Sequence, residues 1–578
     1  MDIHRKTINE KLVAEMTAES LDLLRSFDKL CEDAPSENQK LLLSIINDNQ
    51  NTEIGQKYHF DNINNFQEYA KSVPLTTYED YCNYIDRMIE KNERNIITSY
   101  PIEFYAKTSG TSGSPKKIPV SDRSMKLFRD YSSTFQIAVI QEYYRNSKGI
   151  SIRSGLRFMI LDFTKNKLKN GIPFGSISTA CLSDNSIPHL ESIMTTPKEV
   201  LFCNAGIQLR YLHARFGLEE KDVVMFTGAY IPALLDEMKY IAENWELLVE
   251  DIALGTINPQ FGISEEIVDS LKDRLIPNPE RANELRREFE KGIDETLIKR
   301  IWPNLLSINA IWAGNFSSYA RKLRRYTGDS VPYYSMSYVS SEGIFAIARY
   351  PYEEKYVLIP DSCFYEFIPI EAACDNSPEA QPDTLLMNEL EIGKEYELVV
   401  TNQSGLYRYR MGDIVRVTGF YKNSPAIEFK YRKKNIVSIA GEKFTESDLS
   451  YVIKQFEHRT GILVIDFCMY PDMDSEPGRY IFFIETEEHI SSKQHDYCQR
   501  ILTEELINAS SSLGVYIANG SMGTPKLIFL KRGTFLKFRE QKMFHLGINS
   551  NQFKPLTVIT EDQKEFFLKM SRNTEGII

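Results

Sequence analysis

Residues 103–122 read EFYAKTSGTSGSPKKIPVSD, and this stretch contributes most to the fold assignment. A short apolar entry leads into a run of small residues closed by a proline, and the strand-like triplet Ile118-Pro119-Val120 follows. Glycine and proline in such a run are typical of a loop. Serine caps helices well, so a helix is expected to begin near Ser121. The stretch therefore predicts a strand, a loop, a returning strand and a helix.

The loop in this stretch is a candidate phosphate-binding segment. Glycine lets backbone N–H groups converge on phosphate oxygens, hydroxyl groups add donors, and a lysine supplies positive charge. The candidate ligands are Ser109, Gly110, Thr111, Ser112 and Lys116. The segment is not a Walker loop, because Pro115 stands where that pattern has glycine. A flexible linker rich in glycine and serine is the alternative interpretation.

Length and composition narrow the class of protein. The 578 residues are enough for several domains, and a net charge of -12 opposes general binding to nucleic acid. The eight cysteines form no C-x-x-C pair, which fits neither a disulfide framework nor a zinc site. No stretch approaches the roughly 20 apolar residues of a membrane helix, and the polar start MDIHRKTINE does not resemble a secretion signal. We expect a soluble cytoplasmic protein, a monomer or weak homo-oligomer, without nucleic-acid or membrane partners.

The periodic segments predict a helical first part, a strand-rich centre and a small separate α/β domain. Apolar residues recur at three- and four-residue spacing in residues 21–92 and again in 198–252, as in helices that pack on one face. FTGAY at 226–230 is expected to be a buried turn between two such helices. Strand-like runs accumulate between residues 333 and 420. After about residue 430, helix, strand, strand, helix and strand follow one another.

The segment Tyr338-Val339-Ser340-Ser341-Glu342 is a second candidate for site chemistry, in a stretch whose apolar character predicts burial. A buried carboxylate is costly unless it binds a metal or a cation. Glu342 is therefore a candidate ligand for the magnesium that accompanies ATP, and the hydroxyls of Ser340 and Ser341 are expected to face phosphate. A hydrogen-bonded structural glutamate at a strand end is the alternative.

Three further segments have a polar pattern that suits a nucleotide. Residues 407–413 lie between two strand-like runs, where Gly412 is expected to form a turn, and Asp413 after it can accept hydrogen bonds from both ribose hydroxyls; a surface Arg–Asp pair is the alternative. Residues 432–443 place charged residues on the domain boundary, where a lid can rotate; a basic edge strand is the alternative. Residues 551–555 contain Lys554, which a mobile domain could bring to a phosphate group; a solvated lysine is the alternative.

In their order and spacing these segments resemble the acyl-acid amido synthetases of the auxin-responsive family, a branch of the adenylate-forming enzymes. The family's phosphate loop is similar to TSGTSG with a following lysine, its second motif to Y-x-S-S-E, and its third to Y-R-x-G-D with G-F and F-x-x-R downstream. The resemblance covers roughly residues 70–560. It implies an α/β fold with a large N-terminal adenylation domain of sheets and surrounding helices, 1–431, and a small mobile C-terminal α/β domain, 432–578, with the hinge at Lys434.

The resemblance also implies an activity and roles for residues. ATP and Mg²⁺ would activate a small carboxylic acid as an acyl adenylate, and an amino acid would accept the acyl group. Tyr338 would pack against adenine, Asp413 and Arg432 would hold the ribose, and Glu342, Lys443 and Lys554 would be catalytic. The acyl pocket is expected to use Leu209, Leu212, His213, Met225 and Phe226, an apolar wall in which His213 is alternatively a packed core residue.

Two features depart from the plant members of this family. Gly441-Glu442-Lys443 stands where those members resemble D-K-T, and it is closer to the G-E-K of acyl-CoA ligases. Lys554-Pro555-Leu556 lacks the arginine of the family's tail, which is similar to NQYKTPR. An acyl-CoA ligase is therefore the alternative activity. A catalytically silent nucleotide-binding sensor is a second alternative.

Overall fold

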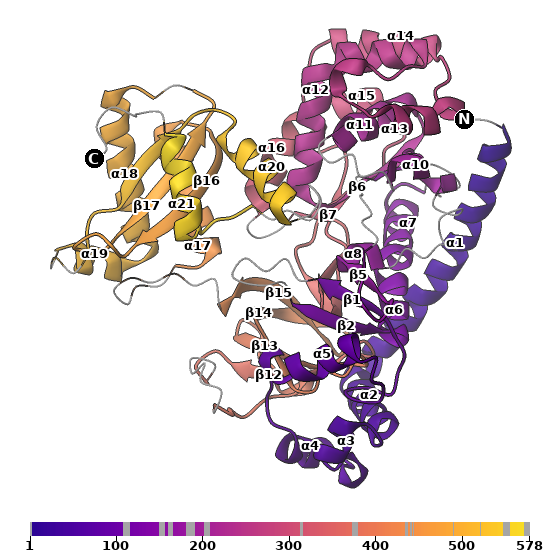
Figure 1. Ribbon diagram of the computed structural model, residues 1–578, viewed down its shortest axis with the longest axis vertical. Helices are drawn as coiled ribbons and strands as arrows, with labels where there is room; N and C mark the ends of the chain where they lie inside the picture. Colours follow the sequence, from indigo (N-terminus) through magenta and orange to yellow (C-terminus); the bar gives the residue numbers. More distant parts are fainter. Residues whose placement is uncertain are drawn as a thin grey trace. The chain divides into compact units, whose positions relative to one another are not determined.

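The chain divides into two compact units, Met1–Phe429 and Lys430–Ile578 (Figure 1). This computed structural model describes residues 3–107, 116–149, 156–159, 166–180, 191–201, 208–312, 316–372, 380–433, 437, 439, 442, 444–488, 490–518, 520, 522–546 and 555–571. Both units mix helices with sheets, as predicted from the sequence.

The larger unit begins with helices, as the periodicity of the first hundred residues predicts. They are α1 (Ile3–Leu30), α2 (Ala34–Asn49), α3 (Glu53–Lys57), α4 (Phe66–Ser72) and α5 (Cys82–Glu90). Asn38 of α2 connects this layer to a sheet, because its amide nitrogen donates to the carbonyls of Pro360 and Cys363 and its oxygen accepts from the N–H of Tyr365. Helix α2 is thereby attached to the sheet beside strand β12 (Phe364–Pro369).

The segment quoted first forms the predicted strand, return and helix. Strand β1 (Ile102–Lys107) pairs antiparallel with β2 (Lys117–Ser121), and Lys107 lies opposite Lys117. Ser121 accepts a hydrogen bond from the N–H of Ser124 and caps α6 (Asp122–Arg129). These two strands belong to a four-stranded sheet of order β2-β1-β5-β4, completed by β5 (Pro173–Gly175) and β4 (Asn166–Lys167).

A parallel sheet of order β3-β6-β7-β8 forms the core of the helical middle part. Its strands are β3 (Leu156–Met159), β6 (Val223–Tyr230), β7 (Ser307–Ile311) and β8 (Tyr333–Tyr334), with α11 (Leu209–Glu219), α12 (Ile231–Leu254) and α14 (Pro279–Glu290) among the helices around it. The prediction of a buried turn at 226–230 is wrong, since these residues end strand β6. A strand covered on both faces has a continuous apolar run instead of alternation, which hides it from a periodicity search.

The seven-stranded sheet has the order β12-β13-β14-β15-β11-β10-β9. Its strands are β9 (Ser337–Ser340), β10 (Gly343–Ile347), β11 (Tyr356–Leu358), β12 (Phe364–Pro369), β13 (Glu395–Thr401), β14 (Tyr409–Tyr421) and β15 (Ser424–Arg432). The predicted strand-rich centre of the chain is therefore confirmed. Its buried side chains join those of the N-terminal helices in one hydrophobic core.

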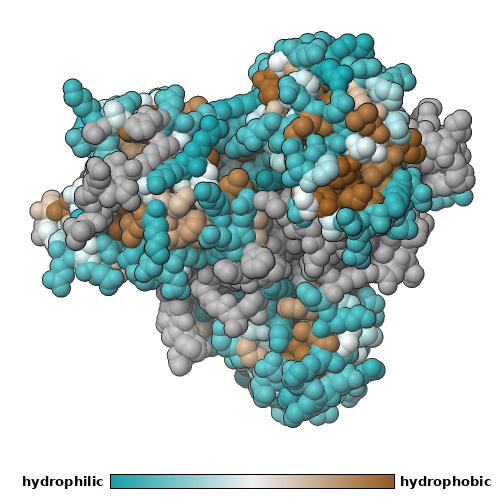
Figure 2. All heavy atoms as spheres, turned by 45° about the horizontal axis from the view of Figure 1, so that its top comes forward, coloured by the Kyte–Doolittle hydropathy of each residue, from teal (hydrophilic) through white to brown (hydrophobic). Residues whose placement is uncertain are grey.

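The smaller unit contains the helices and strands that the pattern after residue 430 predicts. Strands β16 (Val464–Asp472), β17 (Arg479–Thr486) and β18 (Lys526–Leu530) form one sheet, with α17 (Glu446–Thr460) and α18 (Ser492–Ala509) among its helices. Separate apolar clusters pack within the unit. In the described parts of both units, no helix has the length and apolar character needed to cross a bilayer. Among the coloured residues in Figure 2, hydrophilic ones predominate, with separate hydrophobic patches between them.

Candidate active site

Glu342 lies in a tight hairpin turn. Ser340 at the end of β9 pairs with Gly343 at the start of β10, so Ser341 and Glu342 form the two-residue connection. The side chain is half-buried, which corrects the expectation of a carboxylate inside a buried stretch. Apolar residues surround the turn in sequence, but the turn itself brings Glu342 to the edge of the core.

The Glu342 carboxylate is held from two strands. The Ser340 hydroxyl donates to Oε2 at 2.7 Å, and the N–H of Glu342 donates back to Ser340 Oγ at 3.0 Å. From β14, the Tyr409 hydroxyl donates to Oε1 at 3.4 Å. The Asn402 amide nitrogen donates to the Glu342 carbonyl at 2.7 Å. The turn and its carboxylate therefore have a defined orientation.

Asp413 is positioned by a bulge inside β14. Glu397 of β13 lies opposite Ile414, but Val399, two residues on, lies opposite Arg410, so β14 contains two additional residues at this point. Gly412 lies within them at φ +68°, a left-handed conformation that glycine adopts easily. The glycine predicted to turn between two strands is thus part of one continuous strand.

A tyrosine hydroxyl binds the Asp413 carboxylate. Asp413 is 2% exposed, and Tyr338 of β9 donates to its Oδ2 at 2.6 Å. The Tyr338 ring lies 5.3 Å from the ring of Phe345 and 5.9 Å from that of Phe429, centroid to centroid. The structure therefore brings the second and third candidate motifs together, at Tyr338 and Asp413 and again at Glu342 and Tyr409. The burial of Asp413 excludes the alternative of a surface Arg–Asp pair.

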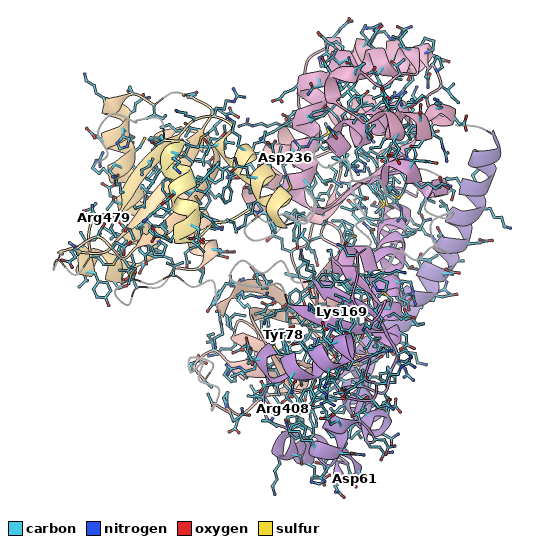
Figure 3. The ribbon with its side chains drawn as sticks, viewed as in Figure 1. Asp61, Tyr78, Lys169, Asp236, Arg408 and Arg479 are labelled. Carbon is cyan, nitrogen blue, oxygen red and sulfur yellow. The ribbon has the colours of Figure 1, made fainter. Side chains whose placement is uncertain are left out.

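The two arginines of the third motif bind glutamates of neighbouring strands. Arg408, labelled in Figure 3, donates to both oxygens of Glu366 and to the carbonyls of Ala70 and Val73. Arg410 binds Glu397 through two hydrogen bonds of 3.0 and 2.8 Å. Both ion pairs are buried or nearly so. They fix the backbone on either side of Tyr409.

Lys116 follows the candidate phosphate loop directly. Its Nζ lies 4.8 Å from the centroid of the Tyr78 ring, and the Tyr78 hydroxyl accepts a hydrogen bond from the N–H of Lys117 at 3.0 Å. Tyr78, labelled in Figure 3, thus contacts the start of β2. Ser109, Gly110, Thr111 and Ser112 lie outside the described residues.

The residues expected to line the acyl pocket belong to two different cores. Leu209, Leu212 and Phe226 are part of the helical core, where the Phe226 ring stacks on Phe158 at 5.0 Å. Met225, the residue before Phe226 in β6, joins the core of the large sheet.

His213 is buried in α11, and its Nδ1 lies 2.9 Å from the hydroxyl oxygen of Thr196. Its environment is that of the hydrogen-bonded core histidine that the sequence left open as an alternative.

Candidate residues in the smaller unit are only partly described. Arg432 is exposed at the end of β15, whereas Lys434, Lys443 and Lys554 lie outside the described residues. Glu442 is 1% exposed, and its Oε1 accepts hydrogen bonds from the N–H of Ile439 and from the Tyr480 hydroxyl. These two bonds anchor Glu442 on strand β17 and give it a structural role.

Glu342 is the described carboxylate considered as a magnesium ligand. Among them, no group of three or more His, Cys, Asp or Glu side chains is placed to hold a metal ion. Magnesium in nucleotide sites is commonly bound by one or two carboxylates together with phosphate oxygens. Glu342, a carboxylate fixed in a half-buried turn, fits this requirement.

Two contributors to this site were missed in the sequence, Tyr409 and Asn402. Tyr409 begins the Y-R-x-G-D pattern, so its position gave a signal, but its contact with Glu342 depends on how the sheet folds. Asn402 follows the end of β13 without a motif of its own, and no pattern points to it.

Known proteins resemble this chain along nearly its whole length. Models of the GH3 family N-terminal, central and C-terminal domains match residues 23–333, 356–432 and 447–563. The probable indole-3-acetic acid-amido synthetase GH3.11 of Oryza sativa subsp. japonica is 28% identical over 558 residues, covering 92% of each chain. The jasmonoyl--L-amino acid synthetase JAR6 of Nicotiana attenuata is 29% identical and covers 95% of each.

A solved structure supports the fold. The GH3.15 acyl acid amido synthetase superposes with a TM-score of 0.82 at 24% identity, covering 96% of each chain. This likeness confirms the predicted α/β fold class. Because the family models match well over half of the residues, the chain belongs to the GH3 family, the acyl-acid amido synthetases that its motifs resemble.

Proposed function

We propose that this protein uses ATP to activate a small carboxylic acid as an acyl adenylate and then joins the acyl group to the amine of an amino acid. The names of its relatives support this class of reaction: they include an indole-3-acetic acid-amido synthetase, a jasmonoyl--L-amino acid synthetase and a 4-substituted benzoates-glutamate ligase of Arabidopsis thaliana, 28% identical. The observation that matters most is the meeting of two motifs, in which Tyr338 binds Asp413 and Tyr409 binds Glu342.

In the first half-reaction a carboxylate oxygen of the acid forms a bond to the α-phosphorus of ATP, and the bond to the β-phosphate breaks so that pyrophosphate leaves. Glu342 would hold magnesium, which when bound supplies positive charge against the phosphates. Ser109 to Ser112 and Lys116 would add donors and charge. Asp413 would accept from the ribose, and the Tyr338 ring would lie against adenine.

In the second half-reaction the neutral amine attacks the acyl carbonyl carbon, AMP leaves with the mixed-anhydride oxygen, and the amine loses a proton. Arg432, which precedes the hinge at Lys434, would assist at the ribose during adenylation. Lys443 and Lys554 would act from the smaller unit, with Lys554 approaching the phosphates when that unit closes. Rotation about the hinge would then expose the mixed anhydride to the amine. This assignment follows the family resemblance. The acyl pocket would draw on the apolar set at α11 and β6, which includes Leu209 and Met225.

Glu442 does not favour coenzyme A over an amino acid as the acceptor. That alternative depends on the similarity of Gly441-Glu442-Lys443 to acyl-CoA ligases. Glu442, however, binds the N–H of Ile439 and the Tyr480 hydroxyl, both within the smaller unit. A glutamate that stabilises its own loop says nothing about which acceptor enters the site.

The proposed function is tested by pyrophosphate release from purified protein with ATP, magnesium and a panel of aromatic and aliphatic acids. Each acid is offered with mixed amino acids or with coenzyme A, and products are identified by mass spectrometry. We expect turnover and an amide product only with amino acids. A thioester product would establish the acyl-CoA ligase instead, and ATP binding without turnover for any acid would favour a sensor.

Glu342→Gln tests the assignment of the catalytic carboxylate. Because the change removes the charge but keeps the shape, we expect ATP–pyrophosphate exchange to fall at least about 100-fold, as for loss of one strong electrostatic contact in a transition state. The matched control is Glu353→Gln, a half-buried glutamate between β10 and β11, which should retain exchange. Equal exchange in both variants, at equal thermal stability, would contradict the assignment.

A further inference from the structure

We infer that Tyr409 is a positioning residue for Glu342, an inference that rests on the proposed function. The contact is one of two tyrosine–carboxylate hydrogen bonds that connect the two motifs in opposite directions. The tyrosine of Y-x-S-S-E, Tyr338, donates to the aspartate of Y-R-x-G-D, and the tyrosine of Y-R-x-G-D, Tyr409, donates to the glutamate of Y-x-S-S-E. Each motif therefore supplies the hydroxyl that orients the other motif's carboxylate.

The backbone and ring of Tyr409 are held by neighbouring residues, so the position of its hydroxyl group is well defined. Its backbone pairs with Val400 of β13 on one side and forms a bridge with Thr76 on the other. The N–H of Thr76 donates to the Arg408 carbonyl, and the N–H of Arg410 donates to the Thr76 carbonyl. The side chain is 3% exposed, and its ring lies 6.3 Å from that of Tyr81.

The hydroxyl complements the hydrogen bond that Ser340 already makes. Ser340 binds Oε2 of Glu342, and Tyr409 lies 3.4 Å from Oε1, so each carboxylate oxygen has its own donor. A donor on a carboxylate restricts the rotation of the group and decides which lone pairs remain for a metal. Losing such a supporting donor typically lowers metal affinity about 10- to 100-fold.

The contact also joins parts of the sheet that are not neighbours. In the order β12-β13-β14-β15-β11-β10-β9, three strands separate β14 from β9. A hydroxyl on β14 can reach the β9–β10 turn only because the sheet curves strongly. The two tyrosine–carboxylate contacts therefore span this curved sheet, and they orient both carboxylates relative to each other.

Tyr409→Phe tests the inference by a measurement other than activity. Binding of Mn²⁺, as a paramagnetic substitute for magnesium, is followed by electron paramagnetic resonance with the full-length protein and a non-hydrolysable ATP analogue. We expect Mn²⁺ to bind about tenfold more weakly, with unchanged affinity for the analogue in the absence of metal. The matched control is Tyr407→Phe, which removes a buried hydroxyl that donates to the Ile97 carbonyl at 2.9 Å and should bind Mn²⁺ like the wild type.

Glu342→Gln separates the inference from the proposed function. If Glu342→Gln and Tyr409→Phe both weaken Mn²⁺ binding, and the double variant is no weaker than Glu342→Gln alone, the inference holds. If Glu342→Gln weakens binding but Tyr409→Phe behaves like Tyr407→Phe, the inference is overturned and the metal assignment stands. If Glu342→Gln binds Mn²⁺ as the wild type does, the metal assignment itself fails, and the inference fails with it.

Discussion

Glu237 gives the larger unit a pH-dependent weakness that a single substitution should remove. Its side chain lies in α12 at 1% exposure, and its Oε1 has no hydrogen-bond partner. Burial raises its pKa from 4.5 to about 8, with nearby Asp236, labelled in Figure 3, adding to the rise and Arg210 opposing it. In the folded protein at neutral pH the group therefore keeps its proton.

The cost of this burial follows from the two pKa values. The unfolded chain releases the proton near pH 4.5 and the folded protein only near 8, so stability falls as the pH rises between these values. At about 1.36 kcal/mol for each pH unit in which only the unfolded chain is ionised, the wild type loses about 3 kcal/mol between pH 5 and pH 7.5. Glutamine at this position has nearly the same shape and no proton to release, so Glu237→Gln should escape the loss.

The assay is thermal unfolding followed by circular dichroism at one scan rate. For a unit spanning 429 residues, an unfolding entropy of about 2.1 cal/mol/K per residue gives about 0.9 kcal/mol/K, so 3 kcal/mol corresponds to about 3 °C. We therefore compare the melting temperatures of Glu237→Gln and the wild type at each pH. We expect the difference between them to be about 3 °C larger at pH 7.5 than at pH 5. Glu246→Gln, an exposed control on the same helix, should show no such change. An equal difference at both pH values would refute the reasoning.

Two further substitutions test the supports of the site. Asp413→Asn removes a charged acceptor, so ATP affinity measured by calorimetry should fall about 10- to 100-fold, as expected for loss of hydrogen bonds to a charged group; unchanged affinity would contradict the ribose assignment. Arg408→Ala leaves Glu366 buried without its partner, at a cost of about 3 to 5 kcal/mol. The melting temperature should fall by several degrees, whereas Arg416→Ala, which breaks a more exposed pair, should lower it little.

Local signals in the sequence were sufficient for much of the fold. Ser121 caps α6, and residues 446–460 form α17, because capping and helical periodicity depend on a few neighbouring residues. The error at residues 226–230 has a physical cause: β6 is covered on both faces, so its apolar run has no period to detect. Gly412 was read as a turn for a similar reason, since a positive φ suits a bulge as well as a turn.

In the candidate site, local sequence signals identify the carboxylates but do not predict the contacts that orient them. Glu342 and Asp413 were found because unusual residue types stand within recognisable motifs, and the resemblance supplied their roles. The hydroxyls that orient them come from β9 and β14, and that contact depends on the curvature of a seven-stranded sheet and on the two additional residues of β14 opposite β13. Without the two additional residues, the part of β14 beyond Arg410 would shift by two positions relative to β13. Asp413 would then lose its hydrogen bond with Tyr338. The bulge therefore belongs to the functional site as much as the carboxylates do.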